Sequence, residues 1–157
     1  MSTRIIVDST VDMAERYAKK AIVVPLSLHF GEETFIDGVT IDRKRFYERL
    51  VESDVLPTTS QPSPAAFGDV FDEVTAAGDS AVVLTVSSKL SGTFQSANIA
   101  AEKYENIYFT AGVHPEYAAV CGDFESWLVP LLSHPKCVGI GEIGLDYHYD
   151  EPPRDIQ

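Results

Sequence analysis

Hydroxyl-bearing side chains gather in three short segments, each placed where an apolar run ends or where a helix is predicted to begin. These segments are "DST" at 8–10, "TTSQPS" at 58–63 and "SSKLSGT" at 87–93. In the last of them, Ser91 and Thr93 offer hydroxyl groups, and Gly92 lets the backbone approach a ligand closely. The helix predicted to follow contributes free backbone N–H groups, so this segment has the chemistry of an anion-binding site. The alternative, in which these hydroxyls only cap helices and complete turns, stays open.

A second group of residues, near the C-terminal end, carries the side chains that divalent metals bind. Glu142 is expected at the carboxyl end of a strand, with Asp146 and His148 just after it. His114 is expected at the matching end of an earlier strand. No two of the 4 histidines form an H-x-H pair, and a dinuclear hydrolase needs more ligands than this group supplies. We therefore expect capping or solvated polar groups here rather than a tight metal site, and we expect no cofactor.

The composition disfavours several classes of partner. The chain of 157 residues has 24 acidic and 12 basic residues, and its formal net charge of −12 repels nucleic acid and anionic membranes. No apolar run is long enough to span a bilayer, so we expect neither a nucleic-acid partner nor a membrane span. The start of the chain lacks the layout of a signal peptide, and Cys121 and Cys137 form no C-x-x-C pair. These features predict a cytoplasmic protein with reduced cysteines.

The segments that must position these residues alternate between strand and helix patterns. Strands are predicted within "RIIVDST", on either side of "GEE" in "AIVVPLSLHFGEETFID", and within "SAVVLTVSS", "NIYFTAGV" and "CVGIGEIGLDY". Helices are predicted within "VDMAERYAKK", "DRKRFYERLVES", "PAAFGDVFDEVTAA", "SANIAAEKYE" and "DFESWLVPLLSHP".

This alternation predicts the α/β fold class. We expect one three-layer sandwich over residues 1–157, with a mainly parallel sheet of about five or six strands and helices on both faces. The loops at the carboxyl ends of the strands then share one edge, where ligands bind in such sheets. The hydroxyl segments and Glu142 are expected at that edge.

Several motifs in the first two thirds of the chain resemble a known family. They are "DST" after the first strand, "VVPLSLHF", "PTTSQPSPAAF" and "SSKLSGTFQSANIAA". Over about residues 3 to 103 they look like the N-terminal part of a DegV-type fatty-acid-binding protein. Proteins of that family have two domains, hold a long fatty acid and present its carboxylate to a partner kinase. The resemblance implies an acyl-chain pocket, although the family's second domain has no counterpart here. The carboxylate-binding positions that it implies are Thr59, Ser60, Ser91, Gly92 and Thr93.

The last third of the chain resembles a different family. The motifs "NIYFTAGVHPEYA" and "VGIGEIGLDYHYDEPPRDIQ", with a helix containing Trp127 between them, look like a central fragment of a TatD-type metal-dependent deoxyribonuclease, over about residues 104 to 157. The resemblance implies that Glu142 is a metal ligand. The family's other metal ligands are missing, so the metal site is expected to be incomplete.

The two resemblances meet within about residues 97 to 106, where both families pass from a helix to a parallel strand. We interpret the chain as an engineered or recombined chimera whose two pieces close one hydrophobic core. The leading hypothesis is a domain without catalytic activity that retains a partial fatty-acid or anion site. One alternative is a fold-level test protein with no ligand, and another is the remnant of a metal-dependent phosphodiesterase. A half-formed pocket would expose apolar surface, so self-association is a further hypothesis.

Overall fold

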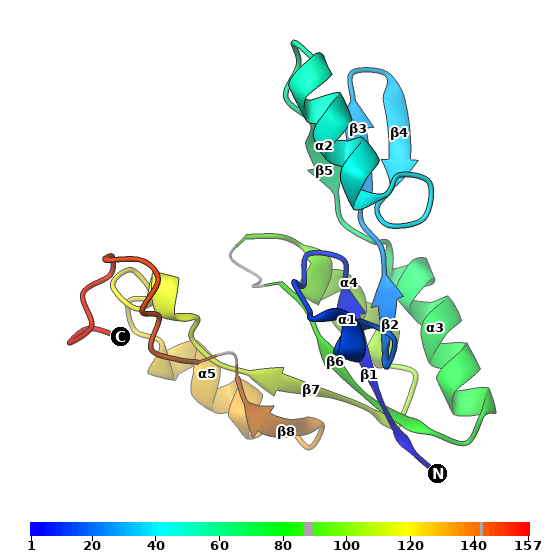
Figure 1. The fold of residues 1–157 in the computed structure, drawn as a ribbon. Coiled ribbons are helices and arrows are strands. Elements are labelled where there is room, and N and C mark those ends of the chain that lie inside the picture. Colours follow the sequence, from blue (N-terminus) through cyan, green and yellow to red (C-terminus); the bar gives the residue numbers. More distant parts are fainter. Residues whose placement is uncertain (87–89, 142) are drawn as a thin grey trace. The chain divides into compact units, whose positions relative to one another are not determined.

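The computed structural model describes residues 1–86, 90–141 and 143–157 (Figure 1). The chain divides into two compact units, Met1–Ile107 and Tyr108–Gln157. No helix in the described part of the chain is long and apolar enough to cross a membrane.

Five strands form a sheet in the order β2-β1-β6-β7-β8. Their bounds are Thr3–Asp8 for β1, Ala21–Val24 for β2, Ser80–Leu84 for β6, Ile107–Ala111 for β7 and Cys137–Ile140 for β8. Strand β1 pairs in parallel with β2 and β6, and β7 pairs in parallel with β8. The predicted α/β class with a mainly parallel sheet is therefore confirmed.

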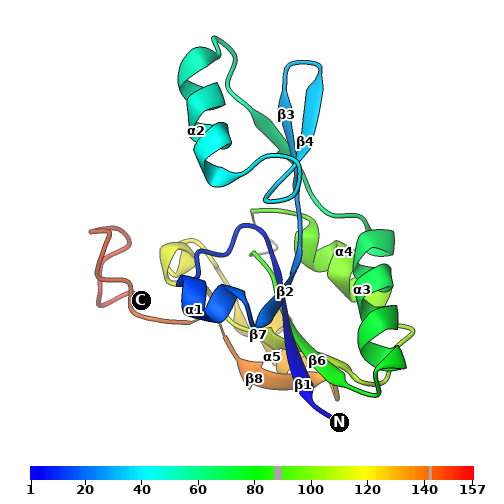
Figure 2. The ribbon, with the colours of Figure 1, turned by 45° about the vertical axis from the view of Figure 1, so that its right-hand side comes forward.

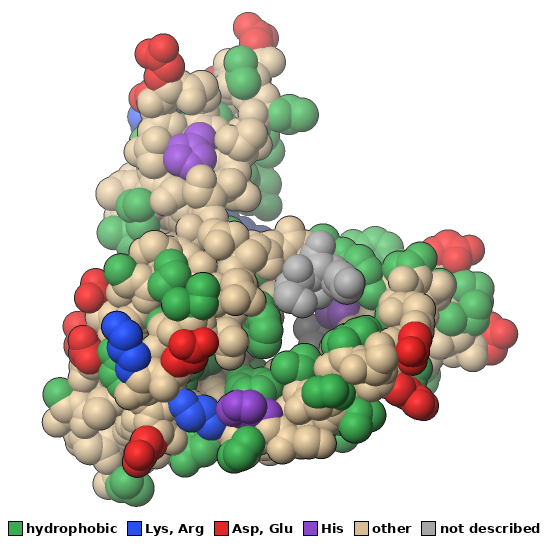
Figure 3. Space-filling model, turned by 180° about the vertical axis from the view of Figure 1, so that it is seen from behind, with side chains coloured by type: hydrophobic (Ala, Val, Ile, Leu, Met, Phe, Trp, Pro, Cys, Tyr) green, Lys and Arg blue, Asp and Glu red, His purple; other side chains and the backbone are tan. Residues whose placement is uncertain are grey.

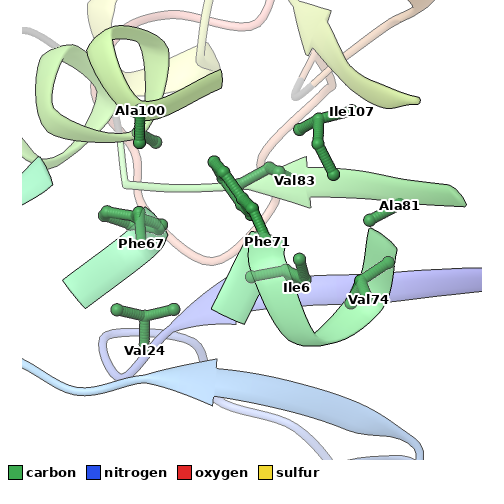
Figure 4. Packing of buried hydrophobic residues seen from close by; sticks show 10 residues of the cluster. Ile6, Val24, Phe67, Phe71, Val74, Ala81, Val83, Ala100 and Ile107 are labelled. Carbon is green, nitrogen blue, oxygen red and sulfur yellow. The ribbon is translucent and has the colours of Figure 1, made fainter. Parts of the chain in front are cut away.

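Two helices cover one face of the sheet in the N-terminal unit. Helices α3 (Pro64–Ala76) and α4 (Thr93–Ala101) enclose the main hydrophobic core against strand residues (Figure 4). The core consists of Ile6, Val24, Phe67, Phe71, Val74, Ala81, Val83, Ala97, Ala100 and Ile107. Alternation along each strand brings the apolar side chains of its inner face to these helices. Helix α3 has the predicted ends, because Ser63 accepts a hydrogen bond from the Ala66 amide and Gly78 follows it with a φ of 70°.

The connections that follow β1 and β6 lead to opposite sides of the sheet. Helix α1 (Glu15–Ala18) connects β1 to its neighbour β2, whereas α4 lies between β6 and β7, on the other side of β1. Right-handed crossovers therefore place α1 on the face opposite to α4, and so opposite to α3, which shares a core with α4 (Figure 2). Helix α1 is shorter than the sequence predicts, since Ala14 offers no capping side chain. The order of the strands thus reverses between β1 and β6, and this is the topological switch point of the sheet.

A second, antiparallel sheet is also part of the N-terminal unit. Its order is β4-β3-β5, with β3 at Ser27–Phe30, β4 at Glu33–Ile36 and β5 at Thr58–Ser60. Helix α2 (Arg43–Glu52), capped by Asp42, belongs to the same lobe. A small core forms there from Leu28, Phe30 and Ile41, with Phe35 and Phe46 packed against it.

The strands predicted on either side of "GEE" pair as a hairpin around Gly31, but two details of the sequence prediction are wrong. The run "AIVVPLSLHF" is not one strand, because Pro25, which has no N–H group for a sheet, separates β2 from β3. The segment at 58–60 is not a loop, because its backbone pairs with β3.

The C-terminal unit contains β7 after Ile107, a short 3₁₀ helix at Pro115–Tyr117, helix α5 (Glu125–Leu132) and β8. Pro130 lies inside α5. Cys121 and Cys137 are both free thiols.

Candidate functional site

The carboxyl edge of β1 and β6 carries the candidate site. Asp8 ends β1, and Val86 lies two residues beyond the end of β6. Since the strand order reverses between these two strands, the chain diverges here, and ligands of parallel α/β sheets bind at such a point. The predicted residues Ser91 to Thr93 follow β6 and lead into α4. Part of the predicted segment, residues 87–89, lies outside the described residues.

Ser91 and Thr93 form a pair of hydrogen-bonded hydroxyl groups. Their Oγ and Oγ1 atoms are 2.9 Å apart, and the Thr93 amide also donates to Ser91 Oγ at 3.3 Å. Thr93 is fully buried and Ser91 is half-buried, so Ser91 is the member of the pair that faces outward. Two hydroxyl groups have two hydrogen atoms, and the hydrogen bond between them uses one of these. The other hydrogen is left to donate to an acceptor such as a carboxylate. The N-cap residue of α4 is Gly92, which has no side chain of its own to act as a cap, and the dipole at a helix start favours a negative charge.

Gln61 joins the first hydroxyl segment to the second. Its side-chain amide donates to Ser96 Oγ on α4 at 3.0 Å. A side chain at Gly92 would collide with the amide of Gln61. The φ of Gly92 is −74°, a backbone conformation open to other residues, so the missing side chain matters here for the room that it leaves to the Gln61 amide. Sequence reasoning gave no role to Gln61, although it lies inside the "TTSQPS" motif.

Thr59 and Ser60, both predicted as ligands, lie on opposite faces of the second sheet. In the pairing of β5 with β3, Thr59 is opposite Leu28 and Ser60 is opposite Ser27, and successive side chains on a strand alternate between faces. Thr59 is thus on the face of the small apolar core, while Ser60 is on the other. The hydroxyl of Ser60 lies 2.8 Å from His29 Nε2.

His29 holds two hydroxyl groups on that face. Its other ring nitrogen, Nδ1, lies 2.9 Å from Thr34 Oγ1. Neutral imidazole has one donor and one acceptor nitrogen, so one of its hydroxyl partners must donate and the other must accept. No hydrogen bond in the described part of the chain joins Thr59 or Ser60 to Ser91 or Thr93. The structure therefore connects the two predicted loops through Gln61, and not through the four predicted hydroxyls.

The candidate metal ligands of the C-terminal unit can be followed only in part. Glu142 lies outside the described residues. His114 accepts a hydrogen bond at Nδ1 from the Glu116 amide, and Asp146 accepts one from the amide of His148 at 2.7 Å. Among the described residues, no three His, Cys, Asp or Glu side chains form a group that could hold a metal ion.

Two shallow hollows lie elsewhere in the N-terminal unit. One of about 590 Å³ is lined by Lys44, Tyr47, Glu48, Val51 and Glu52, all on α2. Another of about 380 Å³ lies near Met1, Asp79 and Tyr104. Neither is lined by a predicted site residue. Acidic side chains are spread over both units on the face shown in Figure 3, in keeping with the net charge of −12.

Comparison with known proteins gives consistent matches to one family. The family model described as "Uncharacterised protein, DegV family" matches residues 2–112. A DegV domain-containing protein of Halalkalibacterium halodurans is 42% identical over 106 residues, which cover 66% of this chain and 38% of that protein. A DegV domain-containing protein of Mycoplasmopsis pulmonis is 28% identical over 141 residues, covering 88% of this chain and 46% of that protein.

Solved structures match over a similar range. A fatty-acid (stearic-acid)-binding protein from Eubacterium ventriosum superposes with a TM-score of 0.62 and 34% identity, covering 68% of this chain and 40% of that one. The chain thus spans less than half the length of the relatives that it matches here.

Proposed function

The chain belongs to the DegV family, and from this premise we propose that its N-terminal unit binds the carboxylate of a long-chain fatty acid and catalyses no reaction. The solved relative that binds stearic acid supports the choice of ligand. The observation that carries the proposal is the contact of Gln61 with Gly92 and Ser96, because it joins the end of β5 to the start of α4, where the predicted hydroxyl groups lie.

The predicted residues have distinct roles in this proposal. Ser91 donates its hydroxyl to the carboxylate, and Thr93 orients Ser91 from its buried position. Gly92 leaves room for Gln61, and the start of α4 favours the negative charge. Thr59 supplies a second hydroxyl from β5, while Ser60 shares its own with His29.

A titration of the delipidated full chain with stearate tests the proposal. We expect stoichiometric binding of stearate and at least roughly tenfold weaker binding of methyl stearate, which lacks the charged acceptor. Thr59→Ala with Ser91→Ala is expected to weaken stearate binding by at least roughly tenfold, since each hydrogen bond to a charged group contributes about 1.5–3 kcal/mol. Thr58→Ala, an exposed hydroxyl on the same strand, is the matched control and should leave the affinity unchanged.

Two alternatives make different predictions for the purified protein. Native mass spectrometry that detects a copurifying fatty acid supports the proposal, whereas bare protein that also ignores added stearate supports a fold without a ligand. Bound stoichiometric metal, with a phosphodiesterase activity that is lost in Glu142→Ala, would overturn the non-catalytic assignment.

The proposal also covers the origin of the chain. We infer that the chain is a chimera with a TatD-like C-terminal segment. The boundary between the compact units, after Ile107, lies one residue beyond the junction expected from the motifs at 97–106. The family match also ends near this boundary, at residue 112. The TatD part rests on the motifs "NIYFTAGVHPEYA" and "VGIGEIGLDYHYDEPPRDIQ" with the Trp127 helix between them, and the longer alignment to the Mycoplasmopsis pulmonis protein weighs against it. A solved structure of residues 108–157 in the full chain that superposes on a DegV protein would refute this proposal.

Self-association is part of the proposal as well. Ile5, Val23 and Leu84 lie on the strands of the N-terminal unit and are 39%, 42% and 42% exposed. Apolar side chains gathered in this way favour association in water. Light scattering is expected to show a mass that rises with concentration, and a monomer at all concentrations would contradict it.

A further inference from the structure

A buried carboxylate ties together the exits of two strands at the switch point. Asp8, the last residue of β1, is 1% exposed. Its Oδ2 accepts a hydrogen bond from the Val86 amide at 2.6 Å. Its Oδ1 accepts from the amide of Thr10 at 2.9 Å and from the hydroxyl of Thr10. Both oxygens therefore accept hydrogen bonds, one from the chain that leaves β1 and the other from the chain that leaves β6. We call this set of hydrogen bonds around Asp8 the clamp.

The chemistry of these contacts requires a carboxylate. Burying a charged group is costly unless hydrogen bonds compensate it, so a buried aspartate with donors on both oxygens is a specific arrangement. The isosteric amide of asparagine has only one oxygen. Its NH₂ group would face either the Val86 amide or the Thr10 donors. On that side of the clamp two hydrogen-bond donors would then face each other, and that hydrogen bond would be lost.

The clamp lies next to the segment that leads to the candidate anion site. Val86 lies five residues before Ser91, at the start of the segment that carries the candidate anion site. The neighbouring Ser9 accepts from the Leu26 amide at 3.1 Å, so the chain after β2 is tied to the same place. The exits of β1, β2 and β6 are thus fixed relative to one another around Asp8 and Ser9.

We propose that Asp8 is a positioning residue for the anion site, because its carboxylate fixes the exit of β6 at Val86, from which the chain leads on to Ser91 and Thr93. Asp8 does not touch the ligand, because both of its oxygens face backbone and side-chain donors of the protein. This inference rests on the proposed function for its ligand readout, and it extends that function to a residue for which sequence reasoning gave no role beyond ending a strand.

The chain offers a matched control for Asp8 at the opposite edge of the same strands. Asp79, just before β6, is 7% exposed. It accepts hydrogen bonds from the Ser2 amide at 2.6 Å and from Arg4 Nε at 2.9 Å. Asp79 thus also joins β1 to β6 through a carboxylate, but it does so at the amino ends of the strands, away from the Ser91–Thr93 turn.

The experiment compares Asp8→Asn with Asp79→Asn in the full chain. Both substitutions keep the volume of the side chain and remove one acceptor, so both are expected to lower stability towards urea. Only Asp8→Asn is expected to weaken stearate binding, by at least roughly tenfold at equal folded fraction. It is also expected to accelerate amide hydrogen exchange at Val86 and Thr93 relative to the core amide of Val83. Asp79→Asn should leave the stearate affinity and this relative exchange within roughly twofold of the wild type.

The outcomes separate this inference from the proposed function. If the wild type binds stearate and Asp8→Asn binds it as well as Asp79→Asn does, the role of Asp8 is refuted while the function stands. If the wild type binds no stearate, the proposed function fails, and exchange in the ligand-free protein still decides the role of Asp8. Equal exchange in the two variants then refutes it. Should Asp8→Asn fail to fold, Asp8→Glu keeps two acceptor oxygens on a longer side chain. It is expected to bind stearate more weakly than Asp79→Asn, and equal affinity would refute the inference.

Discussion

Asp79 shows how the ionisation of a single residue enters the stability of the N-terminal unit. The Ser2 amide, and after it the Arg4 side chain, donate to its carboxylate and hold the pKa of Asp79 below its ordinary value. A carboxyl group whose pKa is lower in the folded state stabilises that state above its unfolded pKa. The contribution disappears as the pH falls towards the folded pKa, because protonation then removes the favoured charge.

We therefore expect Asp79→Asn to change the pH dependence of folding. Wild-type stability should fall as the pH decreases below about 4, and part of that fall should be absent in Asp79→Asn. Urea unfolding between pH 3 and pH 7 measures the difference. Identical pH profiles for the two proteins would contradict the assigned hydrogen bonds.

Thr59 and Ser60 give a second prediction for single residues. Because their side chains lie on opposite faces of β5, one carboxylate is expected to contact only one of them. Since Ser60 already has His29 as a partner, Thr59→Ala should weaken stearate binding by roughly tenfold, and Ser60→Ala by less than roughly twofold. Titrations of the two single variants measure this contrast, and the opposite ranking would place the ligand on the His29 face.

At the scale of the elements, helix ends were the most predictable features. Asp42 and Ser63 cap α2 and α3 at the starts of two segments for which the sequence predicts helices, since a cap depends on a few neighbouring residues. The strand at Thr58–Ser60 was missed because it depends on β3, far away in the sequence, and its own residues are typical of a loop. The clamp of Asp8 on Val86 joins residues 78 positions apart, so no local pattern could indicate it.

The packing of α3 and α2 predicts unequal effects of their side chains. Phe71 on α3 is fully buried in the main core, whereas Val51 on α2 is 87% exposed. We expect Phe71→Ala to lower the free energy of unfolding by about 3–5 kcal/mol, through lost burial and a cavity. Val51→Ala should change it by no more than about 0.5 kcal/mol. Urea denaturation followed by circular dichroism measures both, and a small effect of Phe71→Ala would show that α3 is not central to the core.

At the scale of the whole molecule, the chain has two compact units and a family match that reaches only the start of the second. The sequence predicts one domain over residues 1–157, closed around a single interior. Small domains of this kind unfold in one cooperative step, whereas independent units unfold separately. Cooperativity is therefore the property that tests the single-domain proposal.

The sole tryptophan provides a convenient probe for this test. Trp127 lies in α5, within the C-terminal unit, so its fluorescence reports on that unit. Circular dichroism in the far ultraviolet reports on the helices and strands of both units. For a single domain, we expect the two urea transitions to coincide in midpoint and slope. Transitions that separate by more than the experimental error would establish two independent folding units.

Pro25 has a consequence for how the chain avoids misassembly. It ends β2 after 4 residues, and β2 is the outermost strand of the sheet in the N-terminal unit. An outer strand presents unpaired peptide groups that can recruit the strand of another molecule, and short strands limited by proline are poor templates for such fibril-like growth. Replacing Pro25 with threonine would remove this break between β2 and β3, and the longer edge that results would be a better template for pairing between molecules.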